Sequence, residues 1–413
     1  MLENYIKSSV TQKRLREGLV APHIEDFANW LHAQGFKALT IEGKLRSLAA
    51  WSDWMRASGI RECDAVPGLE ACRAMLKQAR RVYYDRGPNK HTVEAASTYI
   101  RFLQERGIIA RPPVLPTSAE AWPILGEFRS WMREHRGLRE TTLDLYEFTL
   151  LGLVKSLGDD ARAYSAKSIR DFVFNQAKPH GHWRAKAITT AVRSFLRFLG
   201  TTGRCPVGLV HAVPTYSSYQ VQSVPRYLEP ADVQRVIDAC VSEDANGLRD
   251  RAVMLLLARL GLRASDVAQL SFADVDWQNG RIAVCGKGRR KEWLPLPQDI
   301  GDAIIRYLKE GRPPLKIDRI FTKVDAPLGP LTRATVTHIA RSALRRAGVK
   351  APINGAHVFR HSAATAMLRA GVSLYGVSTA LRHRSLNTTN IYAKVDFGLL
   401  SEVAQAWPVV ASC

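Results

Sequence analysis

The chain has 413 residues, with 59 lysines and arginines against 38 aspartates and glutamates, so its formal net charge is +21. This length predicts two or three domains, and the charge favours nucleic acid as the partner over an anionic membrane surface. The six cysteines form no CxxC pair, which excludes a zinc ribbon and a dense disulfide framework. The longest apolar run, at 252–258, is too short for a membrane span, which excludes a membrane protein. Together these observations predict a cytoplasmic chain.

The first block of the chain has helical periodicity. Residues 23–57 carry apolar side chains at helical spacing and predict two amphipathic helices, with Gly35 and Thr40 as stop and start signals. Further helical patterns cover about 68–84 and 91–106. Three prolines within 111–118 then predict a linker, because proline is unsuited to a helix interior. We therefore expect an N-terminal helical domain over 1–112.

The second block, 119–214, repeats features of the first. A constant offset of 101 residues relates Phe27, Trp30 and Thr40 to Phe128, Trp131 and Thr141. An offset of 96 relates YIRFLQERG at 99–107 to FLRFLGTTG at 195–203. We interpret this as a duplicated unit of four to five helices. The alternative is that any two amphipathic helices can share aromatic spacing.

The third block, 224–413, follows a polar linker at about 214–226 that contains two prolines. Its apolar residues have helical spacing to about 262 and again from about 298. Between these segments, around 281–294, the spacing of apolar residues changes, which predicts a β-hairpin or small sheet. The predicted fold is thus multi-domain and mainly α, with two all-α helical bundles and a C-terminal mixed α/β domain that contains a small antiparallel sheet. Basic residues exceed acidic ones in all three parts, by 17 − 12 in 1–110, 15 − 9 in 111–222 and 27 − 17 in 223–413.

The motifs with chemical potential lie in this third block. His357 and Arg360, in HVFRH, are one helical turn apart and can face one anion. His383 stands nine residues before Tyr392, so a tyrosine lies near basic groups. Each residue alone is more often structural than catalytic. Upstream, GLR and CGKGRRK add an arginine and a lysine, and the full set is Arg263, Lys287, His357, Arg360, His383 and Tyr392.

This order of residues resembles the signature of the tyrosine recombinase, or phage integrase, family over about 223–413. The resemblance implies that Arg263 and Arg360 clamp the scissile phosphate, that His383 donates a further hydrogen bond, and that Tyr392 is the nucleophile. It also implies that His357 assists proton transfer and that Lys287 protonates the leaving 5′ oxygen. The implied enzyme is a mobile-element recombinase that cuts and rejoins DNA through a 3′-phosphotyrosyl intermediate, with no metal, ATP or other cofactor.

The chemistry of the residues agrees with these roles. An attacked phosphodiester develops negative charge that two guanidinium groups can bind bidentately. A phenol with a pKa near about 10 needs a cationic pocket and a base before it can attack, and His357 is the natural candidate for the base. A lysine whose pKa is lowered by neighbouring cations can act as the acid. We favour Lys287 for this role, although Lys291 and Arg289 lie in the same turn.

Two positions depart from the family pattern. Arg382 precedes His383 where the family most often has glycine, and Asp266 stands where the family more often has glutamate. The arginine could crowd the turn or add a phosphate contact. The aspartate is shorter by one methylene and could weaken the support of the Arg263 loop. Neither change removes a reactive group, so we expect activity.

The expected partner is double-stranded DNA, with a homodimer on each site and a tetramer in synapsis, and other recombinases as further candidate partners. Apolar residues at helical spacing in 399–407 predict a short helix that packs on its own domain or docks on a neighbouring protomer. Two other functions stay open: a type IB topoisomerase-like relaxing enzyme, and a catalytically inactive DNA-binding accessory subunit. Residues 1–110 could supply extra contacts to DNA or to a protomer. The DNA site and the biological outcome are not encoded in these patterns.

Overall fold

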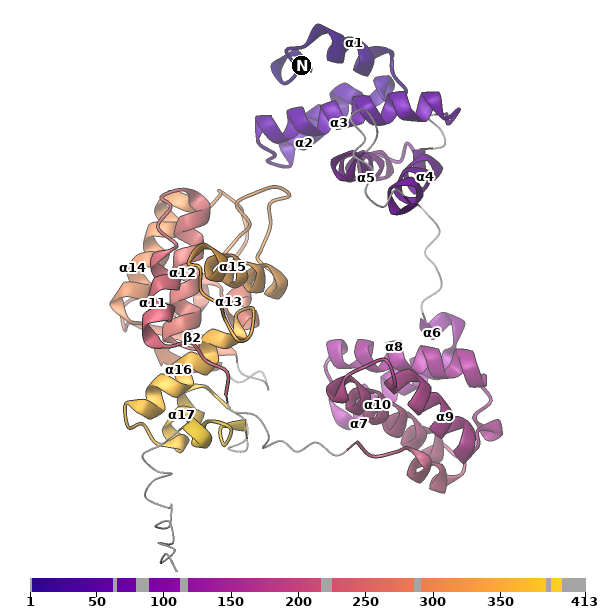
Figure 1. Cartoon of the computed structure of the whole chain (residues 1–413), viewed down its shortest axis with the longest axis vertical. Helices are drawn as coiled ribbons and strands as arrows, with labels where there is room; N and C mark the ends of the chain where they lie inside the picture. The colour runs from indigo at the N-terminus through magenta and orange to yellow at the C-terminus, as the bar shows by residue number, and fades with distance from the viewer. Residues whose placement is uncertain are drawn as a thin grey trace, which may run out of the picture. The chain divides into compact units, whose positions relative to one another are not determined.

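The computed structural model describes residues 2–61, 65–78, 89–111, 118–216, 225–285, 291–383 and 388–395. It is mainly helical and contains a three-stranded antiparallel sheet, as the sequence predicted (Figure 1). The chain separates into two compact units, one of residues 111–222 and one of residues 1–110 together with 223–413. Separate hydrophobic cores occupy 2–103, 124–213 and 228–359. The division into domains at 1–112, 119–214 and 224–413 stays a prediction.

The described residues of the first block form five α-helices. They are α1 (Ser9–Glu17), α2 (Ile24–Ala33), α3 (Ala38–Ala57), α4 (Ala65–Gln78) and α5 (Lys90–Glu105), with short 3-10 helices at Leu2–Asn4 and Ala21–His23. The predicted stop signal Gly35 follows α2 with φ of 82°, a conformation that glycine adopts without strain. At α5, the Asn89 side chain accepts the backbone N–H of Thr92, and the Thr92 hydroxyl accepts that of Asn89, which forms a capping box.

Between residues 118 and 216, where the structure describes the middle block, there are also five α-helices. They are α6 (Ser118–Ala121), α7 (Pro123–Arg136), α8 (Glu140–Leu157), α9 (Ala166–Ala177) and α10 (His182–Thr201), with 3-10 helices at Ala161–Ala163 and Val207–Ala212. Helix α7 ends at Gly137, whose φ of 56° is left-handed and whose N–H donates to Arg133 O at 3.1 Å. Helix α9 begins with a capping box between Ser165 and Ser168.

The same cluster of four aromatic rings lies in the core of both helical blocks. It consists of Phe27, Trp30, Tyr99 and Phe102 in the first, and of Phe128, Trp131, Phe195 and Phe198 in the second. The pair Phe27–Tyr99 has ring centroids 5.2 Å apart at 87°, and its counterpart is 5.3 Å apart at 89°. The pair Trp30–Phe102 is at 5.8 Å and 56°, and its counterpart at 5.8 Å and 54°. This agreement supports the predicted duplication.

The third block surrounds a buried helix with other helices and a small sheet. Its helices are α11 (Pro230–Asp238), α12 (Ala245–Arg259), α13 (Ala264–Gln269), α14 (Gln298–Arg306), α15 (Arg333–Arg346), α16 (His357–Arg369) and α17 (Leu374–Ala380), with a π-helical turn at Tyr307–Gly311 and 3-10 turns at Phe272–Asp274 and Tyr392–Val395. The strands β1 (Val275–Asp276), β2 (Arg281–Cys285) and β3 (Lys291–Pro295) pair in that order, with Ala283 opposite Trp293. Helix α12 is buried along most of its length, as a central helix should be, and its buried residues include the charged pair Arg249 and Asp250.

One segment of the third block differs from the sequence prediction. Helical structure was expected from about 298 onward, but 312–332 contains no helix. Prolines at 313, 314, 327 and 330 remove backbone donors and prevent a helix there. The segment instead forms isolated β-bridges, Ser271 with Arg319 and Thr322 with Pro330.

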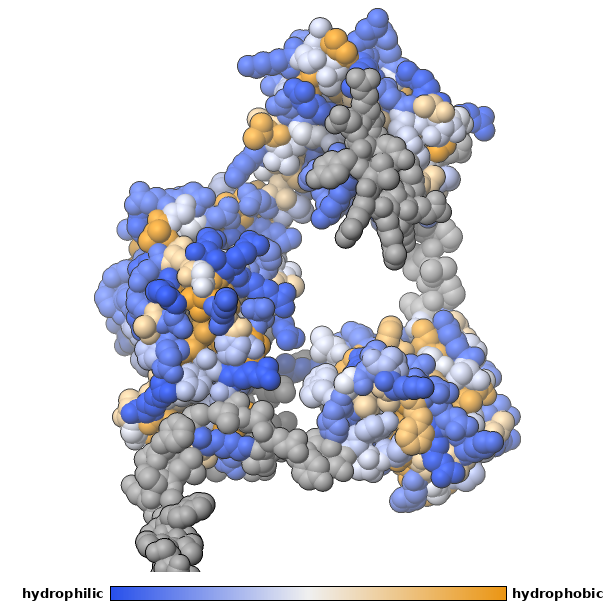
Figure 2. Space-filling model, viewed as in Figure 1, coloured by the Kyte–Doolittle hydropathy of each residue, from blue (hydrophilic) through white to orange (hydrophobic). Residues whose placement is uncertain are grey.

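The molecular surface is mostly polar in the view of Figure 2. Hydrophilic residues cover most of the visible face of each helical part, and smaller hydrophobic areas lie between them. Within the described ranges, the structure contains no helix that is both long and apolar enough to cross a bilayer.

Candidate active site

Helix α16 supplies the centre of the site. It begins at His357, so His357 and Arg360 lie one turn apart as predicted. Arg360 is only 3% exposed, and its guanidinium donates to two backbone carbonyls, through Nη1 to Gly261 at 2.7 Å and through Nη2 to Leu381. These bonds join the end of α12 and the end of α17 to the same arginine. Arg360 therefore orders the two segments that carry the neighbouring site residues.

Arg263 stands at the N-terminal cap of α13, immediately after the loop that contains Gly261. Its Nη2 donates to the carbonyl of Arg382 at 3.3 Å. Gly261 has φ of 58°, and a Cβ built on it would lie 2.8 Å from Leu381 Cδ2. The glycine of the GLR motif is thus required both by its backbone conformation and by the close approach of α17.

His383 and Tyr392 are linked through one buried threonine. His383 Nδ1 and Thr389 Oγ1 lie 2.8 Å apart, within hydrogen-bonding distance. The carbonyl of Thr389 accepts the backbone N–H of Tyr392 at 2.9 Å. The rings of His383 and Tyr392 are parallel, with 4° between their planes and 6.4 Å between their centroids. Thr389 therefore connects the His383 ring to the backbone of Tyr392.

His361 is a site residue to which the sequence analysis gave no role. Its Nδ1 lies 2.8 Å from the Tyr392 hydroxyl, and its ring centroid lies 4.4 Å from that of His357. His357 was the residue expected to assist proton transfer, yet His361 is the one that contacts the phenol. The signal was available in HVFRH, since residues four apart on a helix share a face.

The guanidinium groups of Arg263, Arg360 and Arg382 form a cationic cluster. Burial, followed by the charges of Arg263 and Arg382, lowers the pKa of Arg360 to about 10. Arg360 stays protonated at neutral pH despite this shift. A cluster of positive charge is stabilised by an anion, so this site suits a phosphate group.

The pKa values of the three histidines and of the tyrosine are all shifted in the direction that favours the neutral form of the group. Burial lowers the pKa of His361 and of His383 to about 4 each, and the positive charge of Arg360 adds to both shifts. Burial, followed by the charges of Arg360 and Arg263, lowers the pKa of His357 as well. Burial raises the pKa of Tyr392 to about 12, while Arg360 opposes that rise. Near pH 7 the phenol is thus protonated beside a neutral imidazole.

The structure brings together five of the six predicted residues, and the sixth, Lys287, lies outside the described residues. Of its alternatives in the same turn, Arg289 also lies outside them, whereas Lys291 is described. Lys291 Nζ donates to Asp274 Oδ1 at 2.8 Å, and this hydrogen bond raises the pKa of the lysine. Lys291 is therefore held by a carboxylate. The predicted helix at 399–407 also lies outside the described residues.

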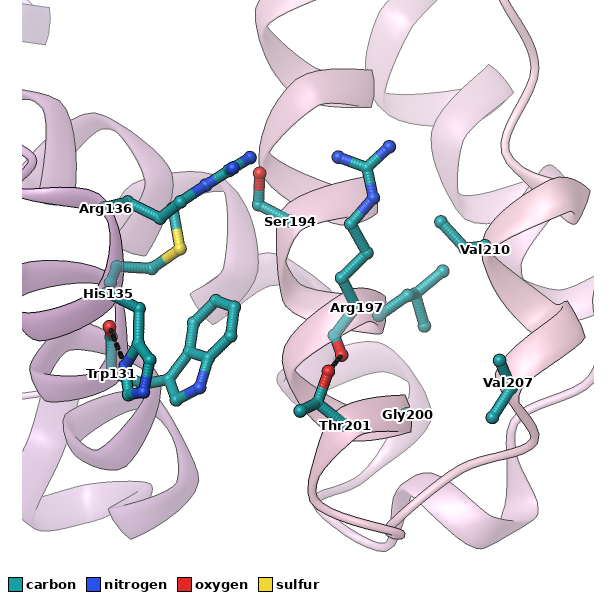
Figure 3. A pocket seen from close by; sticks show the side chains of 11 residues that line it. Trp131, His135, Arg136, Ser194, Arg197, Gly200, Thr201, Val207 and Val210 are labelled. Atoms are coloured by element: carbon teal, nitrogen blue, oxygen red, sulfur yellow. Dashed lines mark hydrogen bonds between the residues drawn. The ribbon is translucent and has the colours of Figure 1, made fainter.

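A pocket in the middle block contains none of the predicted catalytic residues. It lies between α7 and α10 and is lined by the aromatic Trp131 and His135 as well as by Arg136 and Arg197 (Figure 3). Trp131 and His135 stack with centroids 5.1 Å apart. The two guanidinium groups extend toward the same end of the pocket in Figure 3, and the Trp131 indole lies at the other. Cationic and apolar groups are thus combined on one surface.

Comparison with protein families and curated proteins identifies recombinases. The family model of the phage integrase family matches residues 226–398. "Putative integrase/recombinase y4rA" of Sinorhizobium fredii is 34% identical over 415 residues, which covers 98% of this chain and 99% of that protein. Tyrosine recombinase XerD of Ralstonia nicotianae is 30% identical over 294 residues, covering 69% of this chain and 94% of XerD.

Solved structures of similar fold are also recombinases. The post-cleavage complex of XerH with palindromic difH DNA aligns with a TM-score of 0.53 at 20% identity, covering 67% of this chain and 83% of XerH. A lambda integrase dimer on a COC′ core site aligns with a TM-score of 0.51 at 17% identity, covering 79% of this chain and 91% of the integrase. At these identities the likeness establishes the fold.

Proposed function

This chain belongs to the phage integrase family of tyrosine recombinases, and on that basis we propose that it cuts and rejoins DNA strands through a 3′-phosphotyrosyl intermediate on Tyr392. The observation that carries the proposal is the convergence of Arg263, Arg360 and His383 around a tyrosine whose hydroxyl is hydrogen-bonded to His361. Such a site can bind a phosphodiester and present a nucleophile to it.

The first step is an in-line transesterification. The Tyr392 oxygen attacks phosphorus, the bond from phosphorus to the 5′ oxygen breaks, and a 3′-phosphotyrosine and a free 5′ hydroxyl result. Arg263 and Arg360 bind the non-bridging oxygens as their charge increases, and His383 donates to one of them. In the second step, the 5′ hydroxyl of another strand attacks phosphorus and releases the tyrosine. Each step exchanges one phosphoester for another, so no ATP is consumed and the guanidinium charge takes the place of a metal ion.

Two proton transfers accompany each step. The phenolic proton passes to His361, because its Nδ1 already contacts the hydroxyl and a neutral imidazole can accept there. His357, whose ring is against that of His361, stabilises the resulting imidazolium or relays the proton. The leaving 5′ oxygen needs a proton from an acid, and Lys287 is the residue proposed for it.

Each of the three predicted domains has its own role in acting on double-stranded DNA. Residues 224–413 form the catalytic domain, 119–214 form a core-binding-like domain, and 1–112 form a helical domain related to the second by duplication. Arg136 and Arg197 of the middle domain supply cations for phosphate contacts. The lambda integrase of similar fold binds its core site as a dimer, which supports a dimer on each site here. The proposed synapse is a tetramer, and the protein acts on DNA in the bacterial cytoplasm.

A nicked suicide substrate tests the proposal. The duplexes are drawn from DNA that flanks the gene, and the nick lets the 5′ end diffuse away so that the covalent adduct accumulates. Wild-type protein is expected to form an adduct that survives denaturing electrophoresis, and Tyr392→Phe is expected to form none. Tyr375→Phe is the matched control, because Tyr375 is 72% exposed on α17. An adduct of undiminished yield in Tyr392→Phe would refute the mechanism.

A further inference from the structure

Arg382 has an unusual backbone conformation for a residue with a side chain. Its φ is 54°, and it is the one non-glycine residue with positive φ in the part of the chain that the structure describes. Its N–H donates to Thr379 O and the N–H of His383 donates to Ser378 O, both at 2.9 Å. These bonds form a Schellman motif at the end of α17, which usually has glycine at the left-handed position. The motif fixes His383 directly after the helix.

The side chain of Arg382 reaches the other position that departs from the family pattern. It is 1% exposed, and its Nη2 donates to Asp266 Oδ2 at 3.0 Å. The same carboxylate oxygen accepts the backbone N–H of Arg263 at 3.3 Å. One oxygen thus joins the start of α13 to the turn after α17. The longer side chain at 382 makes up for the shorter one at 266.

The stability of the fold alone gives no reason for this ion pair. The left-handed backbone is unfavourable for arginine, and the two charges are desolvated. Arg382 Nε and Nη1 are also buried without a hydrogen-bond partner among the residues described. Buried donors without partners are a cost to folding. Strain of this kind is usually kept where it serves a function.

The ion pair between Arg382 and Asp266 connects the two segments that carry Arg263 and His383, two residues of the proposed reaction. Asp266 holds the backbone of Arg263, and Arg382 is adjacent to His383 in the chain. Arg263 Nη2 in turn donates to the carbonyl of Arg382 at 3.3 Å, so the two segments are joined in both directions. Breaking the ion pair leaves that contact and the two carbonyl bonds of Arg360, to Gly261 and Leu381, to set the separation between the Arg263 guanidinium and the His383 ring.

We propose that Arg382 is a positioning residue, whose buried ion pair with Asp266 holds Arg263 and His383 in register to bind one phosphate. This inference rests on the proposed function. It assigns to Arg382 no contact with the reacting atoms. Because small misplacements of binding groups slow chemistry strongly, loss of the pair is expected to lower the cleavage rate by about 10- to 100-fold.

Single-turnover cleavage of the nicked substrate at saturating protein tests this inference. The variants are Arg382→Gln, Asp266→Asn and the double variant, and Arg306→Gln is the matched control. Arg306 pairs with Glu243 and Glu310, each at 3.1 Å, on α14. DNA affinity and thermal unfolding are measured in parallel. A purely structural defect lowers the fraction of protein that reacts, whereas a positioning defect lowers the rate of the fraction that does.

We expect both single variants to cleave more slowly than wild type, with a DNA affinity within about threefold of wild type. The double variant should cleave no more slowly than the slower of the two single variants, because the two residues act as one unit. Additive losses, or Arg382→Gln cleaving as fast as Arg306→Gln, would overturn the inference. If Arg382→Gln does not fold, Arg382→Gly with Asp266→Asn replaces it, since glycine fits the backbone and both charges of the ion pair are removed. That variant must also cleave slowly.

The controls separate this inference from the proposed function. Tyr392→Phe is run beside the other variants. A wild-type protein without a Tyr392-dependent adduct would overturn the proposed function and this inference with it. An adduct that depends on Tyr392 but forms at a rate independent of Arg382 would overturn the inference alone.

Discussion

Replacing His361 tests how the tyrosine is activated. His361→Leu removes the 2.8 Å hydrogen bond between Nδ1 and the Tyr392 hydroxyl. His361→Asn keeps a polar group near the position of Nδ1 but cannot take up a proton. The two variants therefore separate orientation of the phenol from acceptance of its proton.

The expected magnitudes differ between these roles. A hydrogen bond between neutral groups is worth about 0.5–1.5 kcal/mol, so a purely orienting His361 changes the rate by about 2- to 10-fold and asparagine restores most of it. A proton acceptor contributes about 10²- to 10⁴-fold, and asparagine does not restore it. We expect the larger loss in both variants, because the imidazole is neutral near pH 7 and in direct contact with the hydroxyl.

The assay is single-turnover adduct formation on the nicked substrate, with DNA affinity measured separately. His338→Leu is the control, since His338 is an exposed histidine on α15 of the same domain. Wild-type rates in His361→Leu would show that the contact with Tyr392 has no part in catalysis. Full recovery in His361→Asn would restrict His361 to orientation.

Three further predictions concern stability, charge and DNA binding. Arg360→Lys loses the paired bonds to two backbone carbonyls, so we expect a loss of about 2–4 kcal/mol in unfolding free energy by denaturant titration; an unchanged midpoint would contradict this. Unfolded histidines take up protons near pH 6.5, but His361 and His383 take them up only near pH 4 when folded. The melting temperature should therefore fall as the pH drops from about 6.5 to about 4, and it should fall less in a variant that lacks both histidines. A melting temperature that does not change with pH would count against the burial of these histidines as neutral groups. Replacing Arg136 and Arg197 together by alanine should weaken binding to all DNA sequences alike and reduce the slope of log K against log salt by about 2, and an unchanged slope would exclude both from phosphate contacts.

Local patterns in the sequence were sufficient for much of the fold. Gly35 and the change of period near 281 each act over a few residues, and the end of α2 and the strands β2 and β3 follow from them, whereas the prolines of the predicted linker at 111–118 lie outside the described residues. The non-helical segment at 312–332 was missed because its prolines were not weighed against the apolar periodicity around them.

The sequence was more informative about which residues form the candidate site than about the contacts between them. Arg263, Arg360 and Tyr392 could be selected by motif spacing, which says nothing about which atoms meet. The contact of His361 with Tyr392 depends on how a turn of 3-10 helix packs on α16. The ion pair between Arg382 and Asp266 joins residues 116 positions apart, so each looked like an isolated departure until the fold brought them together.

The charges at the site explain why a proton acceptor is needed in addition to the arginines. In the DNA-free chain, burial raises the pKa of Tyr392 to about 12 even though the charge of Arg360 lowers it. A bound phosphodiester adds a negative charge between the guanidinium groups and the phenol, and so offsets part of the effect of Arg360. The arginines therefore become less able to ionise the tyrosine when the substrate arrives. In the proposed reaction they stabilise the phosphate as its charge grows, and the proton of Tyr392 passes to a neutral base in contact with the phenol, the position that His361 occupies.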